Sequence, residues 1–417
     1  MSADRTARVT IDPDRLWQRH LEMAKIGGTP KGGVNRQALT PEDNRAHLLL
    51  AERARARGWR VFLDDIGNMF LRREGTDPDA PPVMSGSHTD TQPTGGRFDG
   101  IFGVLAAFEA MEAIDEAGIA TRRPLECAVW NNEEGSRFTP GCLGSAVHCG
   151  VFTLDYGLSR TDAQGISMGE AVRELRATLP FAAHRPLQSP VAAFIEAHIE
   201  QGPVLEATGH QIGIVTGMQG NRRFAVEVIG EDAHSGTTPR KARKDALMAA
   251  VDIVQALRAL FQDEQDVLRF TIGRFEVFPG AISVVPGRVF FTIDFRHPSQ
   301  ETLTRLGDLV DGVCRQHRGP CEVTVTDTSS AVPVDFAPTV PDAVTAAARA
   351  RGYKAMPIYS GAGHDARYLH RLCPAGMLFV PCERGISHNE AENAKPEDLA
   401  AGCQVVADVM LDLADRL

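Results

Sequence analysis

Short apolar runs alternate with longer helical patterns through the first half of this chain, and no other feature constrains its fold as strongly. Four runs are rich in strand-forming residues and are predicted strands: 60–64, 82–87, 125–131 and 192–199. Three stretches have helical patterning and are predicted helices: 14–26, 41–57 and 101–118. Strands that alternate with helices indicate an α/β fold with a mainly parallel sheet.

The pattern changes between about residues 213 and 327. Six elements follow there in the order strand, helix, strand, strand, helix, strand: 224–229, 241–261, 267–277, 288–296, 300–317 and 321–327. This βαββαβ order is typical of a ferredoxin-like domain. A chain of 417 residues, 43% of them hydrophobic, also exceeds what one compact core usually holds. We therefore predict a discontinuous domain, 1–212 with 328–417, into which 213–327 is inserted.

Charge and cysteine usage narrow the functional class. The net charge of −10 disfavours a nucleic-acid or anionic-membrane partner. No apolar run reaches the ~18 residues of a membrane span, and the N-terminus lacks the apolar stretch of a secretory signal. The eight cysteines include no Cys-x-x-Cys pair, so we expect reduced thiols in a cytoplasmic protein. Cys142 and Cys149 could be nucleophiles, but burial as small hydrophobic residues is favoured.

Five short segments place His, Asp or Glu beside glycine or other small residues: 86–92, 97–100, 131–137, 196–202 and 386–390. Small neighbours let the backbone turn sharply after a strand, so that a side chain faces a cleft. Three imidazoles with three or more carboxylates suit zinc, manganese or cobalt rather than calcium, whose ligands are all oxygen. None of the five segments lies within 213–327, so the metal site is predicted in the discontinuous domain.

Individual residues in these segments have alternative interpretations. Asp90 follows His88 by two positions and is expected to hold the second ring nitrogen of that imidazole with its carboxylate. Asp99 lies in a glycine-rich loop that could place it between two cations, although alone it would be read as an Asp-Gly turn. Glu133 and Glu134 could be a solvated acidic pair. They end an apolar strand, however, where two structural carboxylates would repel each other with little gain.

Such a residue set predicts hydrolysis by activated water. Two metal ions about 3.5–4 Å apart can share a bridging water, lower its pKa and polarise a carbonyl group. A free carboxylate beside them would take the proton and return it to the leaving nitrogen. The sequence shows no P-loop or Gly-x-Gly-x-x-Gly dinucleotide fingerprint that would support a different mechanism.

The motifs resemble the M20 metallopeptidase superfamily, and specifically its hydantoinase/carbamoylase branch. That branch includes N-carbamoyl-L-amino-acid hydrolases, β-ureidopropionases and allantoate amidohydrolases. Matching strings occur in the same order along nearly the whole chain: 27–34, 86–92, 94–100, 132–138, 198–202, 233–239, 294–298, 360–366 and 387–390. The strings His-Ile-Glu-Gln-Gly and Ala-His-Ser-Gly-Thr-Thr-Pro favour this branch over ordinary M20 peptidases.

The resemblance implies a binuclear centre with two divalent metal ions per subunit; zinc is expected, with manganese, cobalt or nickel as alternatives. The implied ligands are His88, Asp99 and His198 for one ion, and Asp99, Glu134 and His388 for the other. Asp99 would therefore bridge the two ions.

The same resemblance implies the catalytic roles. Glu133 would be the general base and acid, with the metal-bridged water as nucleophile. The segment 213–327 would be the lid and dimerisation domain of a homodimer. It would contribute His234 across the dimer interface to polarise the scissile carbonyl.

For substrate binding, the resemblance implies Arg296 on a carboxylate, a task that suits the planar guanidinium. Four further residues are implied near the substrate: Asn221, Ser283, Gln201 and Gly361. Ser283 departs from the family, because relatives commonly carry asparagine there. Serine reaches less far and offers a hydroxyl in place of an amide, so the preferred substrate stays open.

The leading hypothesis is a cytoplasmic, homodimeric amidohydrolase. It would cleave the N-carbamoyl (ureido) group of a small L-amino or β-amino acid, giving the amino acid, CO2 and ammonia. The alternatives are an allantoate or ureidoglycolate amidohydrolase, and an M20 aminoacylase or dipeptidase. A binding protein that has lost turnover would be favoured by an eroded ligand set, yet all five ligands and Glu133 are present.

Overall fold

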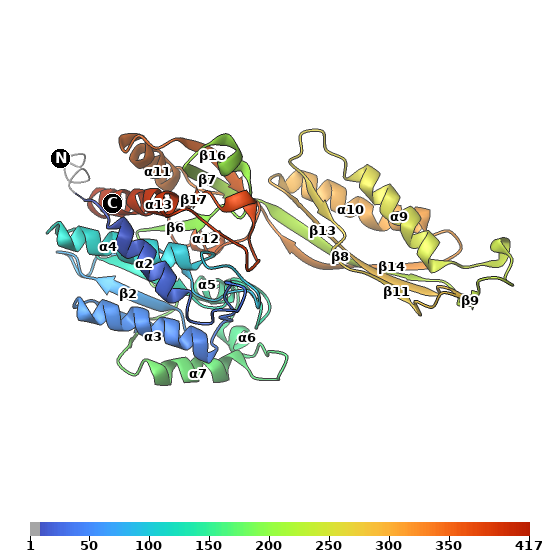
Figure 1. Cartoon of the computed structure of the whole chain (residues 1–417), viewed down its shortest axis with the longest axis horizontal. Coiled ribbons are helices and arrows are strands. Elements are labelled where there is room, and N and C mark those ends of the chain that lie inside the picture. The colour runs from blue at the N-terminus through green and yellow to red at the C-terminus, as the bar shows by residue number, and fades with distance from the viewer. Residues whose placement is uncertain (1–8) are drawn as a thin grey trace. The chain divides into compact units, whose positions relative to one another are not determined.

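The computed structural model of the protein describes residues 9–417 and divides into two compact units (Figure 1). One contains the chain up to Thr216 together with Phe336–Leu417, and the other is Gly217–Asp335. The predicted boundaries, after 212 and after 327, fall inside two strands, β7 (Ile212–Met218) and β14 (Glu322–Ala331). The division between the units lies four residues after the first predicted boundary and eight after the second.

The first unit is built on a mixed sheet in the order β7-β17-β6-β3-β4-β2-β1-β5. Its centre consists of four parallel strands whose residues are all buried: β3 (Val83–His88), β4 (Leu125–Trp130), β6 (Ala193–Ile199) and β17 (Ala375–Val380). Strands covered on both faces have few polar residues. The exceptions here are Ser85, Ser87 and His88 on β3, Glu126 on β4, and Glu196 and His198 on β6. The remaining strands are β1 (Arg60–Leu63), β2 (Met69–Arg73), β5 (Ala183–His184), β15 (Val334–Asp335) and β16 (Ala355–Ser360).

The prediction of a mainly parallel sheet is corrected by β1, β2 and β7. Strand β2, which the sequence reading missed, pairs antiparallel with both β1 and β4, and β7 pairs antiparallel with β17. Only a short turn separates β1 from β2, and such a turn can connect only antiparallel strands. The α/β class itself is confirmed.

Helices cover this sheet. They are α2 (Pro13–Met23), α3 (Pro41–Ala56), α4 (Ile101–Glu116), α5 (Leu143–His148), α6 (Leu154–Leu158), α7 (Met168–Thr178), α8 (Val204–Thr208), α11 (Thr339–Ala350), α12 (Ala366–Leu369) and α13 (Pro396–Arg416), with a 3-10 turn η2 (Glu383–Gly385). Helix α4 is buried almost all round because it packs on β3, β4 and β6 and also contacts α2 and α13 (Figure 1). Its apolar sequence fits that central place.

The second unit has the predicted βαββαβ order with additional short pieces. Its elements are β8 (Gly220–Ile229), β9 (Ala233–His234), η1 (Arg240–Ala242), α9 (Ala246–Leu260), β10 (Arg269–Thr271), β11 (Phe275–Phe278), β12 (Val284–Val285), β13 (Arg288–His297), α10 (Gln300–His317) and β14. The sheet order is β10-β13-β8-β14, with β11 also paired to β13, so the single strand predicted at 267–277 is two strands. Apolar side chains between this sheet and α9 and α10 form a separate core.

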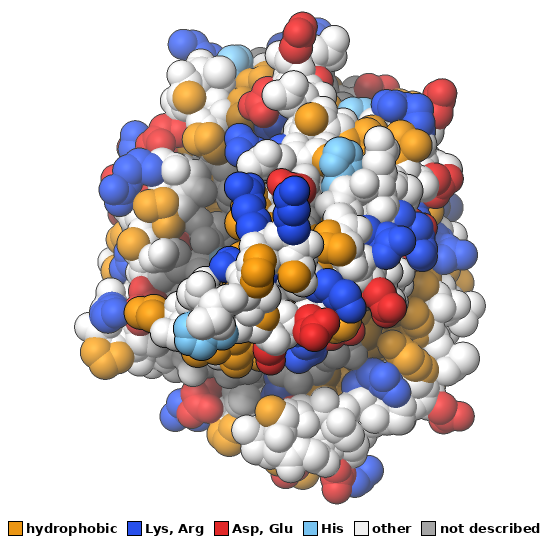
Figure 2. Space-filling model, turned by 90° about the vertical axis from the view of Figure 1, so that its right-hand side faces the viewer, with side chains coloured by type: hydrophobic (Ala, Val, Ile, Leu, Met, Phe, Trp, Pro, Cys, Tyr) orange, Lys and Arg blue, Asp and Glu red, His pale blue; other side chains and the backbone are white. Residues whose placement is uncertain are grey.

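Large hydrophobic side chains remain exposed on the second unit: Ile229, Met248, Phe275, Phe278 and Ile282. Ile282 is fully exposed, at 101%. Figure 2 shows exposed hydrophobic side chains next to basic ones. Exposed apolar side chains that gather on one surface are typical of a contact with another molecule. Among residues 9–417, no helix is long and apolar enough to span a membrane.

Candidate metal centre

The predicted ligands lie where strands of the central sheet end. His88 is the last residue of β3, and His198 is the penultimate residue of β6. Glu134 follows β4, and His388 lies in the connection between η2 and α13. Since β3, β4 and β6 run parallel, their carboxyl ends meet at one edge of the sheet, where polar groups of α/β folds collect.

The first ligand cluster consists of His88, Asp99 and His198, all buried. The Oδ1 atom of Asp99 lies 3.0 Å from Nε2 of His198 and 3.8 Å from Nε2 of His88. The three ligand atoms lie within 4.8 Å of one another. Two imidazoles and a carboxylate at this spacing form a donor set for a borderline divalent cation such as zinc.

The second cluster shares Asp99 with the first and adds Glu134 and His388. Nε2 of His388 lies 3.4 Å from Oδ2 of Asp99 and 3.3 Å from Oε2 of Glu134. Asp99 thus turns one carboxylate oxygen towards each cluster. The residues fit a pair of cations that share one carboxylate, as the resemblance implied.

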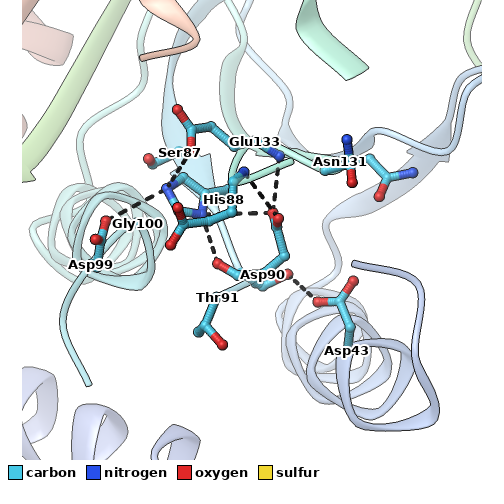
Figure 3. A network of polar contacts seen from close by, with 12 residues as sticks. Asp43, Ser87, His88, Asp90, Thr91, Asp99, Gly100, Asn131 and Glu133 are labelled. Atoms are coloured by element: carbon cyan, nitrogen blue, oxygen red, sulfur yellow. Dashed lines mark hydrogen bonds and ion pairs between the residues drawn. The ribbon is translucent and has the colours of Figure 1, made fainter. Parts of the chain in front are cut away.

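Gly100 makes the approach of Asp99 to His88 sterically feasible. Its φ is +67°, in the region that glycine adopts readily. A Cβ atom at this position would lie 2.2 to 2.4 Å from atoms of the His88 ring, which is far inside van der Waals contact. Figure 3 shows Gly100 and Asp99 at the start of α4, directly beside the imidazole.

Backbone carbonyls orient both imidazoles of the first cluster. Nδ1 of His88 is 2.9 Å from the carbonyl oxygen of Asp90, and Nδ1 of His198 is 2.8 Å from that of Ile199. A carbonyl only accepts, so each Nδ1 carries the proton and donates it. The lone pair of each Nε2 then faces the centre of the cluster, where a metal ion needs it.

The prediction for Asp90 is corrected in its geometry. Its carbonyl oxygen, and not its carboxylate, orients His88; Oδ1 is 3.6 Å from the ring nitrogen. The carboxylate instead accepts the backbone N–H groups of Glu133 and Glu134, each at 3.1 Å (Figure 3). The alternation expected along a strand does not apply, since β3 ends at His88 and Asp90 lies outside the strand.

A network that the sequence reading missed holds the segment after β3. The Asp43 carboxylate accepts a hydrogen bond of 2.6 Å from the Thr89 hydroxyl. The fully buried Arg36 donates from Nε to the carbonyl of Thr89 at 2.8 Å, and its backbone N–H donates to the Thr91 hydroxyl. These partners are distant in sequence, so no local signal could have revealed them.

Charge interactions set the protonation of the ligands. Burial alone would raise the pKa of Asp99, but hydrogen bonds from His198 and His388 hold that pKa well below its usual value. Hydrogen bonds to Asp99 and Glu134 raise the pKa of His388 to about 10. Burial lowers the pKa of His198, but Asp99 more than compensates and raises it to about 9. The two clusters therefore bind positive charge strongly.

Glu133 lies beside the first cluster without being part of it. Its Oε2 is 3.4 Å from Nε2 of His88, and its side chain is almost completely buried. Burial raises the pKa of Glu133 well above the usual value, and the negative charges of Asp365 and Glu134 add to this effect. A carboxylate with a raised pKa binds a proton readily, which a general base requires.

Gln201 and Gly361, both predicted near the substrate, lie in the first unit. Gln201 donates from Nε2 to Oδ2 of Asp99 at 2.9 Å, so it contacts a predicted metal ligand. Its Oε1 is buried and has no hydrogen-bond partner within residues 9–417. Gly361 is exposed in the connection between β16 and α12.

The other four predicted residues form two neighbouring pairs in the second unit. Asn221 on β8 is directly opposite Arg296 on β13, and Arg296 contacts Asp294 at 3.3 Å. His234 is exposed and lies beside Ser283, whose carbonyl accepts the N–H group of the residue after His234.

Hydrogen bonds select the tautomer of His234. Its Nδ1 accepts the backbone N–H groups of Gly236 and Thr237, at 3.0 and 3.1 Å. The neutral ring therefore carries its proton on Nε2 and presents a hydrogen-bond donor there.

All eight cysteines are free and buried, as expected for reduced thiols. Burial and the charge of Glu133 raise the pKa of the Cys142 thiol well above its usual value. The favoured interpretation of Cys142 and Cys149 as buried residues agrees with this placement.

Comparisons with known proteins identify the family of the chain. The family model for peptidase family M20/M25/M40 matches residues 84–412. The chain is 39% identical to an N-carbamoyl-L-amino-acid amidohydrolase of Rhizobium meliloti, covering 97% of each protein, and 35% identical to an allantoate amidohydrolase of Bacillus subtilis, covering 94% and 95%. An amidase of the hydantoinase/carbamoylase family from Burkholderia multivorans superposes with a TM-score of 0.91 at 45% identity, over 97% of this chain and 98% of that one. As its motifs predicted, the chain therefore belongs to peptidase family M20/M25/M40, and it is a hydrolase of amide C–N bonds.

Proposed function

We propose that the protein hydrolyses the N-carbamoyl (ureido) group of a small L-amino or β-amino acid. Water adds to the ureido carbon, the bond to the leaving nitrogen breaks, and the products are the amino acid, CO2 and ammonia. The observation that carries this proposal is the pair of ligand clusters that share Asp99, with Glu133 beside them and outside both. The names of the most similar relatives support the substrate class.

Two divalent metal ions held by these clusters, with zinc expected, would act as Lewis acids and lower the pKa of water. Glu133 would take a proton from the attacking water and return it to the leaving nitrogen. Its raised pKa supports both steps, because the group must bind the proton and then release it. Asp90 would hold Glu133 and Glu134 in place through their backbone N–H groups.

The second unit would be the lid and dimerisation domain of a homodimer. Its exposed hydrophobic side chains support a contact with another subunit. Arg296, with Asn221 opposite it, would bind the substrate carboxylate. His234 would polarise the scissile carbonyl of the neighbouring subunit, a task that its Nε2 donor suits.

Allantoate is the second candidate substrate, because relatives at 34 to 35% identity are named allantoate amidohydrolases. Ser283 is the position at which we expect the preference to be set. A substrate panel tests the proposal: N-carbamoyl α- and β-amino acids, allantoate, ureidoglycolate and N-acetyl amino acids, after reconstitution with zinc, manganese, cobalt or nickel. We expect the highest kcat/KM on an N-carbamoyl amino acid. A preference for allantoate, or hydrolysis of N-acetyl amino acids alone, would contradict this assignment.

A further inference from the structure

One residue outside the ligand set contacts Glu133 through both its main chain and its side chain. The thiol Sγ of Cys142 lies 3.2 Å from Oε1 of Glu133 and donates to it. The backbone N–H of Cys142 also donates to the carbonyl oxygen of Glu133, at 2.7 Å. Both side chains are buried, each 8% exposed, so water competes little for either hydrogen bond.

The surrounding backbone fixes the position of this thiol. Two further hydrogen bonds join the same segments, from Leu143 N–H to the Asn132 carbonyl at 3.2 Å and from Gly144 N–H to the Asn131 carbonyl at 3.0 Å. Cys142 itself has a φ of +51°, a conformation that few non-glycine residues adopt. The loop that carries the thiol is thus attached residue by residue to the loop that carries the carboxylate.

The Cys142 thiol is protonated, as a hydrogen-bond donor must be. Burial raises the pKa of the Cys142 thiol well above its usual value, so the sulfur keeps its hydrogen and acts as a donor. A thiol is a weak donor compared with a hydroxyl or an N–H group. It can therefore fix the direction of a carboxylate without strongly stabilising the charged form, which would weaken a base.

We propose that Cys142 is a positioning residue for the general base: its thiol holds Oε1 of Glu133, so that Oε2 faces the reacting water beside His88. The distances support this division of roles, since Oε2 is the oxygen near the ligand cluster, 3.4 Å from Nε2 of His88. This inference rests on the proposed function, in which Glu133 transfers the proton.

Three variants test the role in catalysis. Cys142→Ala removes the donor, and we expect kcat to fall about 10-fold, with KM and metal content within about twofold of wild type, because a misdirected base affects the chemical step alone. Cys142→Ser retains a donor and should recover most of that loss. Cys149→Ala is the matched control: it also removes a buried thiol from this region, and we expect kcat to stay unchanged. Circular dichroism checks the fold of each variant.

An infrared measurement tests the contact without turnover. In metal-free protein, the difference spectrum between wild type and Cys142→Ser isolates the S–H stretching band of Cys142. At a pH at which Glu133 is ionised, we expect that band to lie at the low frequency of a hydrogen-bonded thiol and to rise in Glu133→Gln, because an amide oxygen accepts more weakly than a carboxylate. If no substrate is hydrolysed, the proposed function is wrong, but the frequency of this band still shows whether the Cys142 thiol donates to Glu133. The inference is overturned if the band does not move in Glu133→Gln, or if Cys142→Ala and wild type have equal kcat.

Discussion

Glu133 and Glu134 are adjacent in sequence but have different partners. Glu134 accepts hydrogen bonds from Gln92 and faces His388 in the second cluster. Glu133 is held by Cys142 and has a strongly raised pKa. The same residue type therefore serves as a predicted ligand at one position and as a predicted base at the next.

This contrast gives a prediction with an internal control. Glu133→Gln should lower kcat by on the order of 10²-fold or more, since positioned proton transfer is lost, while both metal ions stay bound. Glu134→Gln should instead lower the metal content, because an amide oxygen is a poorer ligand than a carboxylate. Steady-state kinetics and elemental analysis distinguish the two. Near-wild-type turnover in Glu133→Gln would remove the general-base role.

The raised pKa values of two ligands predict that metal binding depends on pH. With values of about 10 for His388 and about 9 for His198, both imidazoles are protonated at pH 7.5 in the metal-free protein. A metal ion needs the neutral ring, so binding must release protons, and affinity should rise as pH rises towards these values. Calorimetric titration with zinc in two buffers of different ionisation enthalpy measures the proton release. His388→Ala should reduce it, and zinc affinity that is the same at pH 6 and pH 8 would contradict the prediction.

At the scale of elements, the sequence predicted the strands that a local pattern of apolar residues defines. The runs at 82–87, 125–131 and 192–199 correspond to β3, β4 and β6, since strands buried on both faces consist mainly of apolar and small residues. The positions of His88 and His198 at strand ends followed from the same reading. Strand direction could not be predicted in the same way, because the pairing partners of a strand are distant in sequence. Strand β17 was missed, although all six of its residues are buried.

The site shows the same division between local and long-range information. The residue types and the order of the predicted ligands could be read from the motifs, and the structure brings all five together. The side-chain direction of Asp90 could not be predicted, because it depends on the path of the irregular backbone that follows β3. Nor could the contact between Cys142 and Glu133, which depends on how two loops pack.

The two glycines that flank α4 allow a test at this scale. Gly100 and Gly118 have nearly equal φ angles, +67° and +65°. A Cβ at Gly100 would collide with His88, whereas no other described atom lies within 4 Å of a Cβ at Gly118. Both alanine variants should lose stability through the positive φ, by about 1–2 kcal/mol for a left-handed residue, and Gly100→Ala should lose more because its ψ of −55° lies outside the left-handed helical region. Only Gly100→Ala should also lose metal, because the imidazole must move. Thermal unfolding and metal content check this, and full metal content in Gly100→Ala would contradict it.

At the scale of the whole molecule, each unit has its own hydrophobic core, and the predicted functional residues are divided between them. The ligands and Glu133 belong to the first unit, while His234 and Arg296 belong to the second. If the proposed roles hold, a complete site needs both units; in the proposed homodimer, Arg296 would act in its own subunit and His234 on the neighbouring one.

Mixing two inactive variants tests that sharing. If Arg296 binds substrate in its own subunit and His234 acts on the neighbouring one, a heterodimer of His234→Ala and Arg296→Ala contains one site that lacks both groups and one intact site. Random exchange of equal amounts gives heterodimers in half of the dimers, so activity should return to about a quarter of wild type. Each variant alone, taken through the same exchange, is the control. Light scattering should show a dimer throughout. If labelled subunits demonstrably exchange and no activity returns, His234 acts within its own subunit or has no part in the reaction.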